Sequence, residues 1–153
     1  MIRTSVKANK DLIAHITKEV KKAQKTTLSV GIINAGTYED GTPVTAVAAM
    51  HEFGAGVPKR SFLKMPFEVK QKELKKAFTD GYNGVLMGKY TAKTAMSKVG
   101  LVAQGISKNA IKEQGYGNWK PLKEATVSAK GGKSKILFDT GRLVQSITYK
   151  VNQ

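Results

Sequence analysis

One segment constrains the fold more than any other, a stretch of helical period that runs from residue 91 to residue 113. Small and apolar residues recur there at steps of three and four, which predicts an amphipathic helix of four turns or more. A helix of that kind must bury its apolar face against other elements. Gly100 and Gly105 lie within the segment and predict close approach of another backbone. The recurring residues are Ala92, Ala95, Met96, Val99, Val102, Ala103, Ile106, Ala110 and Ile111.

Helical and extended patterns alternate along the rest of the chain. No internal repeat and no linker interrupts them, so one domain spanning residues 1–153 is expected. Before the long segment, the pattern predicts a helix at 7–24 with Asn9 as its cap, a strand at 26–33, a loop at 37–43, a short helix at 43–53, a loop at 54–60 and a helix from Met65 to Gly81. After it, the pattern predicts a break at 115–122, one or two helical turns at 123–130, a loop at 130–135, a turn at 139–141, a brief helix and a strand at 147–151.

These elements predict an α+β fold, in which a small antiparallel or mixed sheet packs against several helices with one long helix at the centre. The strand at 147–151 is expected to join the strand at 28–33, which would bring both ends of the chain into one sheet. Asp139 or Thr140 is expected to cap the brief helix that carries Leu143.

Composition limits the chemistry and the partners. The chain of 153 residues has no cysteine, which excludes disulfides, thiolate nucleophiles and thiolate-bound metals. Its net charge of +15 predicts attraction to nucleic acid or to an acidic protein surface. Arginine occurs only at 3, 60 and 142, so a diffuse lysine field is favoured over base-specific readout. No apolar run is long enough to span a bilayer and no signal pattern opens the chain, so a soluble protein made in a cytoplasm, with no membrane partner, is expected.

The segment at 50–68, MHEFGAGVPKRSFLKMPFE, combines a His-Glu pair, two glycines, a Lys-Arg pair and two prolines. Such a combination is found in an active site, a nucleic-acid clamp or a loop that docks on another protein. His51 and Glu52 begin like the zinc motif H-E-x-x-H, but the second histidine is missing. With only two histidines in the chain, no metal site is expected. His51 is instead expected to be a packed, hydrogen-bonded histidine, and Glu52 a partner for Lys59 or Arg60.

Other catalytic patterns are also incomplete. GGKS at 131–134 resembles the end of a phosphate-binding loop, but the glycine required at position 127 is a valine. A solvated basic loop is the ordinary interpretation, and a loop that becomes ordered on an anionic partner is the alternative. No G-x-S-x-G elbow is present, and Glu39 and Asp40 lie in a turn where solvated charge is common. The sequence therefore predicts no catalytic residue, no cofactor and no enzyme activity.

Aromatic and basic residues are adjacent in two places, Phe62 near Arg60 and Trp119 beside Lys120. Bases that stack on such aromatics beside cations would indicate single-strand binding. The chain has few aromatic residues and must bury some of them, so Phe62 and Trp119 are interpreted as core or interface anchors.

Two segments resemble a known family. They are AVAAMHEFGAGVPKRSFLKMPFE and NWKPLKEATVSAKGGKSKILFDTGRLVQSITYKV, which together cover about a third of the chain. Both are similar to segments of the tail-completion (virion morphogenesis) and neck proteins of tailed bacteriophages, in the same order and with a long helix between them. Ser61 departs from that pattern, in which proline is usual. The matching residues are His51, Glu52, Phe53, Gly54, Pro58, Arg60, Phe62 and Leu63, then Trp119, Pro121, Leu122, Thr126, Lys130, Asp139, Thr140, Gly141, Leu143, Ser146 and Ile147.

The resemblance implies a structural virion protein of the neck or tail top, which assembles as a homo-oligomeric ring at the head-tail junction. Its implied partners are other virion proteins, namely a connector or adaptor ring and the tail tube or tail terminator. The glycines and Pro58 shape a loop that is expected to place Phe62 and Leu63 in a pocket of a neighbouring subunit. The candidate interface residues are His51, Glu52, Phe53, Gly54, Pro58, Arg60, Phe62, Leu63, Trp119, Asp139, Thr140, Gly141 and Leu143.

The alternative function is a nucleic-acid-binding accessory protein that uses its lysine-rich faces. Binding of that kind weakens steeply with salt, with a log-log slope of about −0.9 per phosphate contact. Lysine contact with DNA in a tail channel also stays open, as do the copy number and the choice between neck, tail-completion and tail-terminator rings.

Overall fold

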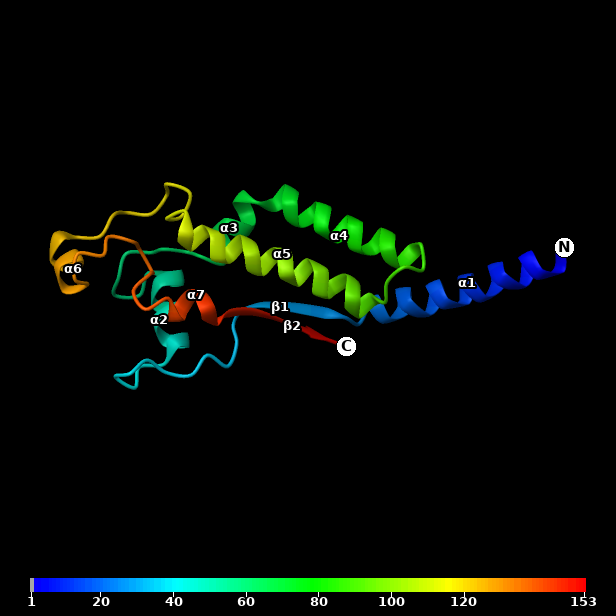
Figure 1. Cartoon of the computed structure of the whole chain (residues 1–153), viewed down its shortest axis with the longest axis horizontal. Helices are drawn as coiled ribbons and strands as arrows, with labels where there is room; N and C mark the ends of the chain where they lie inside the picture. The colour runs from blue at the N-terminus through cyan, green and yellow to red at the C-terminus, as the bar shows by residue number, and fades with distance from the viewer. Residues whose placement is uncertain (1) are drawn as a thin grey trace. The chain divides into compact units, whose positions relative to one another are not determined.

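The computed structural model describes the backbone from residue 2 to residue 153 and the side chains from residue 9 onward. It confirms the expected α+β class, with a two-stranded antiparallel sheet and the expected long helix, α5 (Figure 1). None of the described helices is both long enough and apolar enough to cross a bilayer. The elements in chain order are α1 (Ile2–Ala23), β1 (Thr27–Ile32), α2 (Val44–Phe53), α3 (Lys64–Val69), α4 (Gln71–Leu86), α5 (Ala92–Lys112), α6 (Glu124–Ala129), α7 (Arg142–Ser146) and β2 (Ile147–Asn152).

Two local predictions need correction, and one is confirmed. Helix α1 begins at Ile2, so Asn9 lies inside the helix and does not cap it. The helix expected from Met65 to Gly81 is two helices, because the chain leaves helical geometry at Lys70, and the second helix continues to Leu86. The predicted pairing of the first and last strands is confirmed.

The chain forms two compact units, each assembled from segments that are distant in sequence. Unit 1 takes the chain up to Ser29 together with Lys72–Val102 and Lys150–Gln153. Unit 2 takes Val30–Gln71 and Ala103–Tyr149. Because neither unit is one continuous stretch, no linker could mark them in the sequence. The expectation of a single domain stays a prediction.

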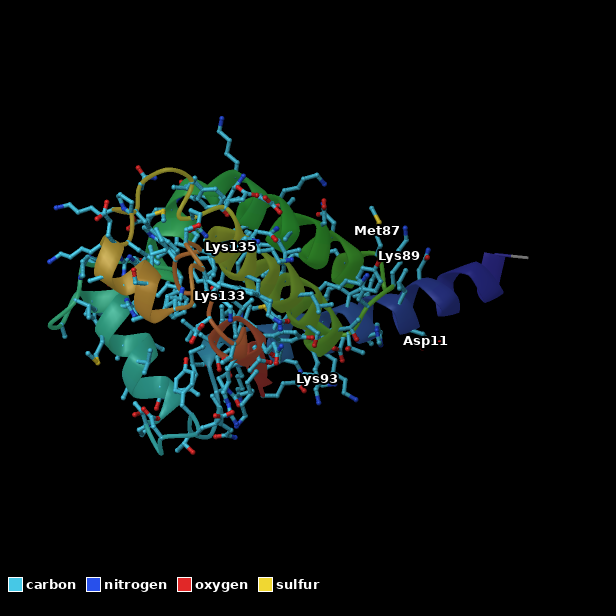
Figure 2. All side chains as sticks on the ribbon, turned by 60° about the vertical axis from the view of Figure 1, so that its left-hand side comes forward. Asp11, Met87, Lys89, Lys93, Lys133 and Lys135 are labelled. Atoms are coloured by element: carbon cyan, nitrogen blue, oxygen red, sulfur yellow. The ribbon has the colours of Figure 1, made fainter. Side chains whose placement is uncertain are left out.

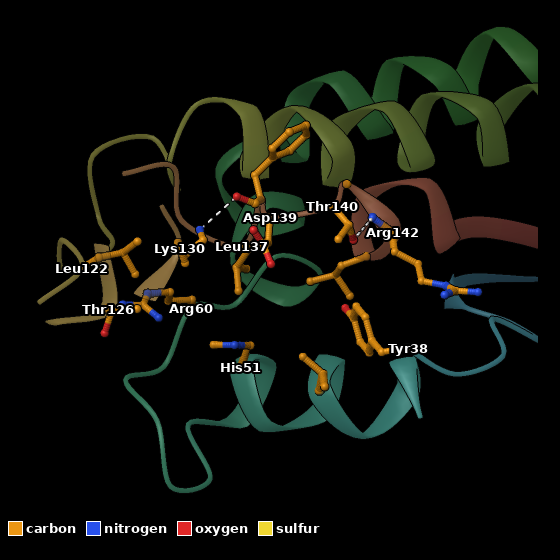
Figure 3. Close-up of a pocket in the computed structure, with 14 residues that line it drawn as sticks. Tyr38, His51, Arg60, Leu122, Thr126, Lys130, Leu137, Asp139, Thr140 and Arg142 are labelled. Atoms are coloured by element: carbon orange, nitrogen blue, oxygen red, sulfur yellow. Dashed lines mark hydrogen bonds between the residues drawn. The ribbon is translucent and has the colours of Figure 1, made fainter. Parts of the chain in front are cut away.

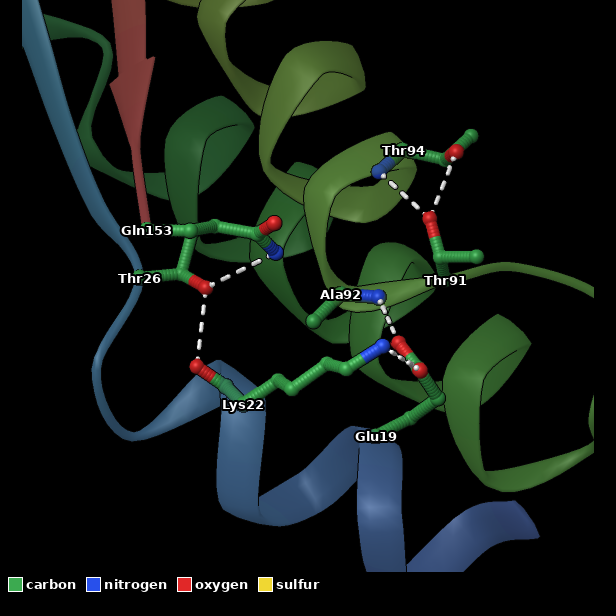
Figure 4. Close-up of polar contacts among 7 residues, drawn as sticks. All are labelled: Glu19, Lys22, Thr26, Thr91, Ala92, Thr94 and Gln153. Carbon is green, nitrogen blue, oxygen red and sulfur yellow. Dashed lines mark hydrogen bonds and ion pairs between the residues drawn. The ribbon is translucent and has the colours of Figure 1, made fainter.

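In unit 1, a buried carboxylate joins α1 to α5. Glu19 accepts a hydrogen bond from the backbone N–H of Ala92 at 2.9 Å and another from Lys22 Nζ at 2.7 Å (Figure 4). Ala92 is the first residue of α5, so Glu19 supplies an acceptor that the start of a helix lacks. These two hydrogen bonds lower the pKa of the Glu19 carboxyl, and the one from Lys22 has the larger effect. Nearby, Gln153 Nε2 donates to Thr26 Oγ1 at 3.4 Å.

Glycines inside α4 explain why this helix continues beyond its predicted end. A Cβ at Gly84 would overlap the ring of Tyr90, and one at Gly81 would lie 3.4 Å from the Cβ of Ala95. These glycines therefore allow the following segment to approach α4, which lies beside the first half of α5 (Figure 1). The close approach predicted at Gly105 is wrong, because a Cβ there would meet nothing within 4 Å in the described part of the chain.

In unit 2, the second half of α5 packs against a core of apolar side chains and contributes Ile111 to it. Ser107 on this helix donates a hydrogen bond to the carbonyl oxygen of Phe62 at 2.6 Å, and Gln104 donates to that of Ile147 at 2.8 Å. The helix therefore positions both the loop before α3 and the start of β2. The buried core residues are Val44, Ala48, Phe62, Ile111, Trp119, Ile136, Leu143, Val144 and Ile147. Of the two alternatives given for Phe62 and Trp119, core or interface anchors, their burial in this core supports the first.

Replacing Gly84 with Ala is expected to lower the free energy of unfolding by about 1–3 kcal/mol, because the new methyl group overlaps the Tyr90 ring. Gly105→Ala is the matched control, with open space at its Cβ and an expected gain of about 0.4–1 kcal/mol. Urea unfolding followed by circular dichroism measures both. A Gly84→Ala protein as stable as the wild type would contradict the packing of Tyr90 on α4.

Candidate functional site

The carboxylate of Glu52, at the end of α2, organises the loop that follows. Oε1 accepts hydrogen bonds from Ser61 Oγ at 2.7 Å and from the N–H of Lys64 at 3.0 Å. Oε2 accepts from the N–H of Phe62 at 2.8 Å and from that of Leu63 at 3.0 Å. These backbone groups lie at and just before the start of α3, where a helix has no acceptors of its own. Glu52 therefore caps a helix from a different segment of the chain. The residue is buried, with 8% of its surface exposed.

Ser61 is the second member of this network. Its hydroxyl donates to Glu52 and accepts a hydrogen bond from the N–H of Met65 at 2.9 Å. A proline at this position would lack both interactions, so Ser61 provides hydrogen bonds that a proline ring could not. The expected pairing of Glu52 with Lys59 or Arg60 is wrong, since the ion pairs of the described residues include neither. Backbone N–H groups and Ser61 occupy the carboxylate instead.

The loop at 54–60 folds back on α2. Gly54 has a φ of 81° in the left-handed region, and its N–H bonds to the carbonyl oxygen of Met50 at 2.8 Å. A Cβ at Gly54 would lie 3.0 Å from the Cβ of Lys59, so glycine fits both the backbone geometry and the space. The far end of the loop is held against α2 by a hydrogen bond from the N–H of Arg60 to the carbonyl oxygen of His51 at 2.7 Å.

This turn directs Phe62 inward, which corrects the interface expected from the sequence. Phe62 is fully buried in the core of its own chain and is not available to a neighbouring subunit. Leu63 is half-buried and packs against the same core. The physical reason is the Glu52 network, which holds the N–H groups of both residues against α2.

The segments at 46–68 and 118–151 meet around one pocket of about 270 Å³ in unit 2 (Figure 3). His51 and Arg60 come from the first segment, and Lys130 comes from the loop after α6. Helix α2 packs against α7, which brings the turn before α7 to the same place. The remaining lining residues are Tyr38, Val47, Leu122, Thr126, Leu137, Phe138, Asp139, Thr140, Gly141, Arg142 and Leu143.

Two buried nitrogens of this pocket have no hydrogen-bond partner among the described residues, His51 Nδ1 and Arg60 Nε. His51 is half-buried, and no hydrogen bond to its Nδ1 is found in the described part of the chain, so the expectation of a packed, hydrogen-bonded histidine is met only in part. Burial lowers the pKa of His51, and the nearby charge of Arg60 lowers it further, so the imidazole is neutral at pH 7. Burial also lowers the pKa of Arg60.

Lys130 is held at the pocket by the loop that it begins. Its Nζ donates to the carbonyl oxygens of Lys135 at 2.7 Å and Phe138 at 2.9 Å. Burial is the main cause that lowers the pKa of Lys130. Asp139 is the one carboxylate among the lining residues, and it lies 3.7 Å from Lys133 Nζ. The half-buried ammonium of Lys130 therefore links two points of the glycine and lysine loop.

The candidate residues from the sequence fall into three groups. Those that line the pocket are His51, Arg60, Asp139, Thr140, Gly141 and Leu143. Those buried beneath it or against the core are Glu52, Phe62, Leu63 and Trp119. Those that lie in or beside the loop at 54–60 are Phe53, which is 76% exposed, Gly54 and Pro58. The expectation that Asp139 or Thr140 caps α7 is wrong, because the N-cap residue is Gly141 and no side chain caps it. Thr140 Oγ1 accepts a hydrogen bond from the N–H of Arg142 at 3.3 Å.

Sequence reasoning missed several pocket residues. Tyr38 lies in a turn closed by a hydrogen bond from its N–H to the carbonyl oxygen of Thr42, and burial raises the pKa of its phenol. An aromatic residue inside an otherwise polar turn was the available signal. For Arg142, the available signal was that arginine is rare in a chain that carries most of its positive charge on lysine.

The polar groups of the pocket suit an anion better than a metal. Arg60, Lys130 and Arg142 are cations, and His51 is the neutral donor or acceptor beside them. Within the described residues, no group of three or more His, Cys, Asp or Glu could hold a metal ion. A set of cations with one carboxylate attracts negative charge.

Comparison of the chain with models of known protein families, with curated proteins and with solved structures finds no match. Function is therefore inferred from the fold, the pocket and the segments that form it.

Glu52→Ala is expected to lower the free energy of unfolding by roughly 3–5 kcal/mol, because four donors around a buried carboxylate lose their acceptor. Glu68→Ala is the control, since its exposed carboxylate lies 3.9 Å from Lys64 Nζ and contributes less than about 1 kcal/mol. Guanidinium unfolding measures both variants. Equal losses in the two proteins would contradict the role assigned to Glu52.

Proposed function

We propose that this chain is a structural protein of a tailed-phage virion, located in the neck or at the top of the tail, where it completes the tail or joins it to the head. One observation carries the proposal. The two segments that resemble tail-completion and neck proteins are far apart in sequence, yet they form the walls of one pocket. A shared pocket gives both segments a common role in contact with another protein.

In this proposal the function is geometric and nothing is turned over. Copies of the chain associate head to tail into a ring, with a rotation that closes. The ring joins a connector or adaptor ring to the tail tube or tail terminator. The protein is made in the host cytoplasm and acts in the virion. Its net charge of +15 favours docking on an acidic neighbour, where electrostatics contributes on-rate and register more than affinity.

Exposed apolar side chains in unit 1 support association with further protein. Leu86 ends α4 and Met87 follows it. Met87 is 63% exposed and extends outward beside Lys89 (Figure 2). Leu12 of α1 lies at the same turn, because a Cβ at Gly88 would be 3.0 Å from Leu12 Cδ1. Single exposed apolar residues are normal, but a group of them marks an interaction surface.

The proposal is tested by electron microscopy of lysates from a phage whose gene for this chain carries an early stop codon. Filled heads lying apart from tails, or tails of uneven length, are expected because the joining ring is missing. The same phage supplied with the wild-type gene from a plasmid is the control and should give joined virions. Intact, joined virions from the stop-codon phage would contradict a structural role.

A nucleic-acid-binding accessory protein is the second candidate, and one observation favours it. Lys18, Lys21, Lys22 and Lys25 line the same hollow along the end of α1. If this face binds phosphates, the affinity for a labelled DNA duplex falls with salt at a log-log slope of about −0.9 per contact. The Lys18→Gln, Lys21→Gln double variant should then reduce the slope by about 2. An unchanged slope would exclude this helix face as a DNA-binding site.

A further inference from the structure

We propose that the pocket of unit 2 binds a carboxylate side chain, flanked by apolar residues, on an acidic segment of another virion protein. The inference rests on the proposed function and adds the chemistry of the contact. It follows from an incompletely paired guanidinium, a fixed lysine, the apolar walls around them and the charge of the whole chain.

Arg60 is the central cation of this site. Its side chain is 94% buried, since 6% of the residue is exposed. Among the described residues, the guanidinium makes one hydrogen bond, from Nη2 to the carbonyl oxygen of Lys120 at 3.5 Å, and Nε has no partner. A guanidinium carries five N–H donors in a planar fork that matches a carboxylate. Burying such a charge without an anion is costly, so an entering carboxylate gains both the ion pair and the hydrogen bonds.

Lys130 supplies a second cation in a fixed position. Two of its three ammonium donors are used by carbonyl oxygens of its own loop, which leaves the third for a ligand. Figure 3 shows Lys130, Arg60 and His51 around the same space. Asp139, the one carboxylate among the lining residues, is exposed and lies 3.7 Å from Lys133 Nζ. It therefore leaves Arg60 without an ion pair in the described part of the chain.

The size and walls of the pocket define what enters. A volume of about 270 Å³ is just below the roughly 300–1,000 Å³ typical of pockets that enclose small ligands, so one side chain with parts of its neighbours fits. Leu122, Leu137 and Leu143 contribute apolar surface around the cations. A carboxylate on a flexible stem between apolar residues matches both features, and a nucleotide with its base and sugar does not.

The net charge identifies the source of the carboxylate. The net charge of +15 gives copies of the chain no electrostatic attraction for one another, so ring contacts between copies depend on other interactions, and each copy has only 11 Asp and Glu to offer. A different protein with an acidic surface has the complementary charge. The site therefore explains how a strongly basic ring protein could recognise an acidic neighbour at a defined point as well as through its overall field.

The test uses nuclear magnetic resonance of the ¹⁵N-labelled full chain. Arginine occurs only at positions 3, 60 and 142, so the Nε–H signals are few, and Arg3→Lys and Arg142→Lys variants assign them. The probe is acetyl-Leu-Glu-Leu-amide, and its control is acetyl-Leu-Gln-Leu-amide, which has the same shape without the charge. The glutamate peptide should shift the Arg60 signal along a saturating curve, and the glutamine peptide should not at equal concentration.

A pair of charge-matched variants locates the site. Lys130→Gln should weaken binding of the glutamate peptide about tenfold, as expected for loss of a charge-assisted hydrogen bond. Lys123→Gln removes the same charge from an exposed residue that does not line the pocket and should leave binding unchanged. If Lys130→Gln does not fold, the two peptides on the wild-type chain still decide the question.

Five results would overturn the inference. Equal shifts with both peptides, or none with the glutamate peptide, would show that no carboxylate is recognised. Tighter binding of inorganic phosphate would indicate a general anion site, and tighter binding of a short oligothymidylate would indicate a nucleic-acid site. Movement of the Arg60 signal with protein concentration alone would identify a second copy as the occupant. If the peptides fail while the stop-codon phage still yields separate heads and tails, the pocket inference falls and the proposed function stands.

Discussion

The carboxylate of Glu52 is the contact on which the architecture of unit 2 depends. A buried charge is tolerated only when its hydrogen bonds are satisfied, and here one hydroxyl and three backbone N–H groups provide them. By holding these groups, Glu52 fixes where the loop at 54–60 ends and where α3 begins. The same turn sends Phe62 into the core and leaves Arg60 at the pocket. One acidic side chain thus determines both the packing of a large aromatic residue and the position of the main cation.

The long helix α5 provides the complementary support. Its apolar stripe fills the cores of the units, while polar residues on it reach carbonyl groups that would otherwise be buried without partners. Ser107 does this for Phe62 and Gln104 does it for Ile147. Near its end, Gln114 accepts a hydrogen bond from the N–H of Ile136 at 2.7 Å. A helix that looks simply amphipathic in sequence is therefore also a source of fixed hydrogen bonds for irregular segments.

Much of the fold could be predicted from the sequence, because periodicity reports local structure. The spacing in α5 and the alternation in β1 gave the correct elements, and the small number of aromatic residues correctly indicated a buried Phe62 and Trp119. Errors arose where tertiary contacts override local preference. Gly81 was expected to end a helix, but it allows close packing of Ala95.

The candidate site was less accessible to sequence reasoning for the same physical cause. Glu52 was expected to pair with the adjacent cations, because sequence proximity cannot show that backbone N–H groups will occupy its oxygens. Arg60 and Asp139 were identified as candidates, but their shared pocket depends on contacts between α2 and α7. Tyr38 entered that pocket from a third segment with no motif to mark it.

The pairing of β1 with β2 has a consequence for how the chain is made. The two strands are separated by most of the sequence, so β1 leaves the ribosome on the order of ten seconds before its partner is synthesised. During that interval its edge is open, and unpaired edges favour association between chains. Helix α7 and the turn that lines the pocket are also among the last segments to be made. The sheet and the pocket are therefore completed at nearly the same time. A chain released before Ile147 lacks β2, so β1 has no partner strand when the chain meets an assembly.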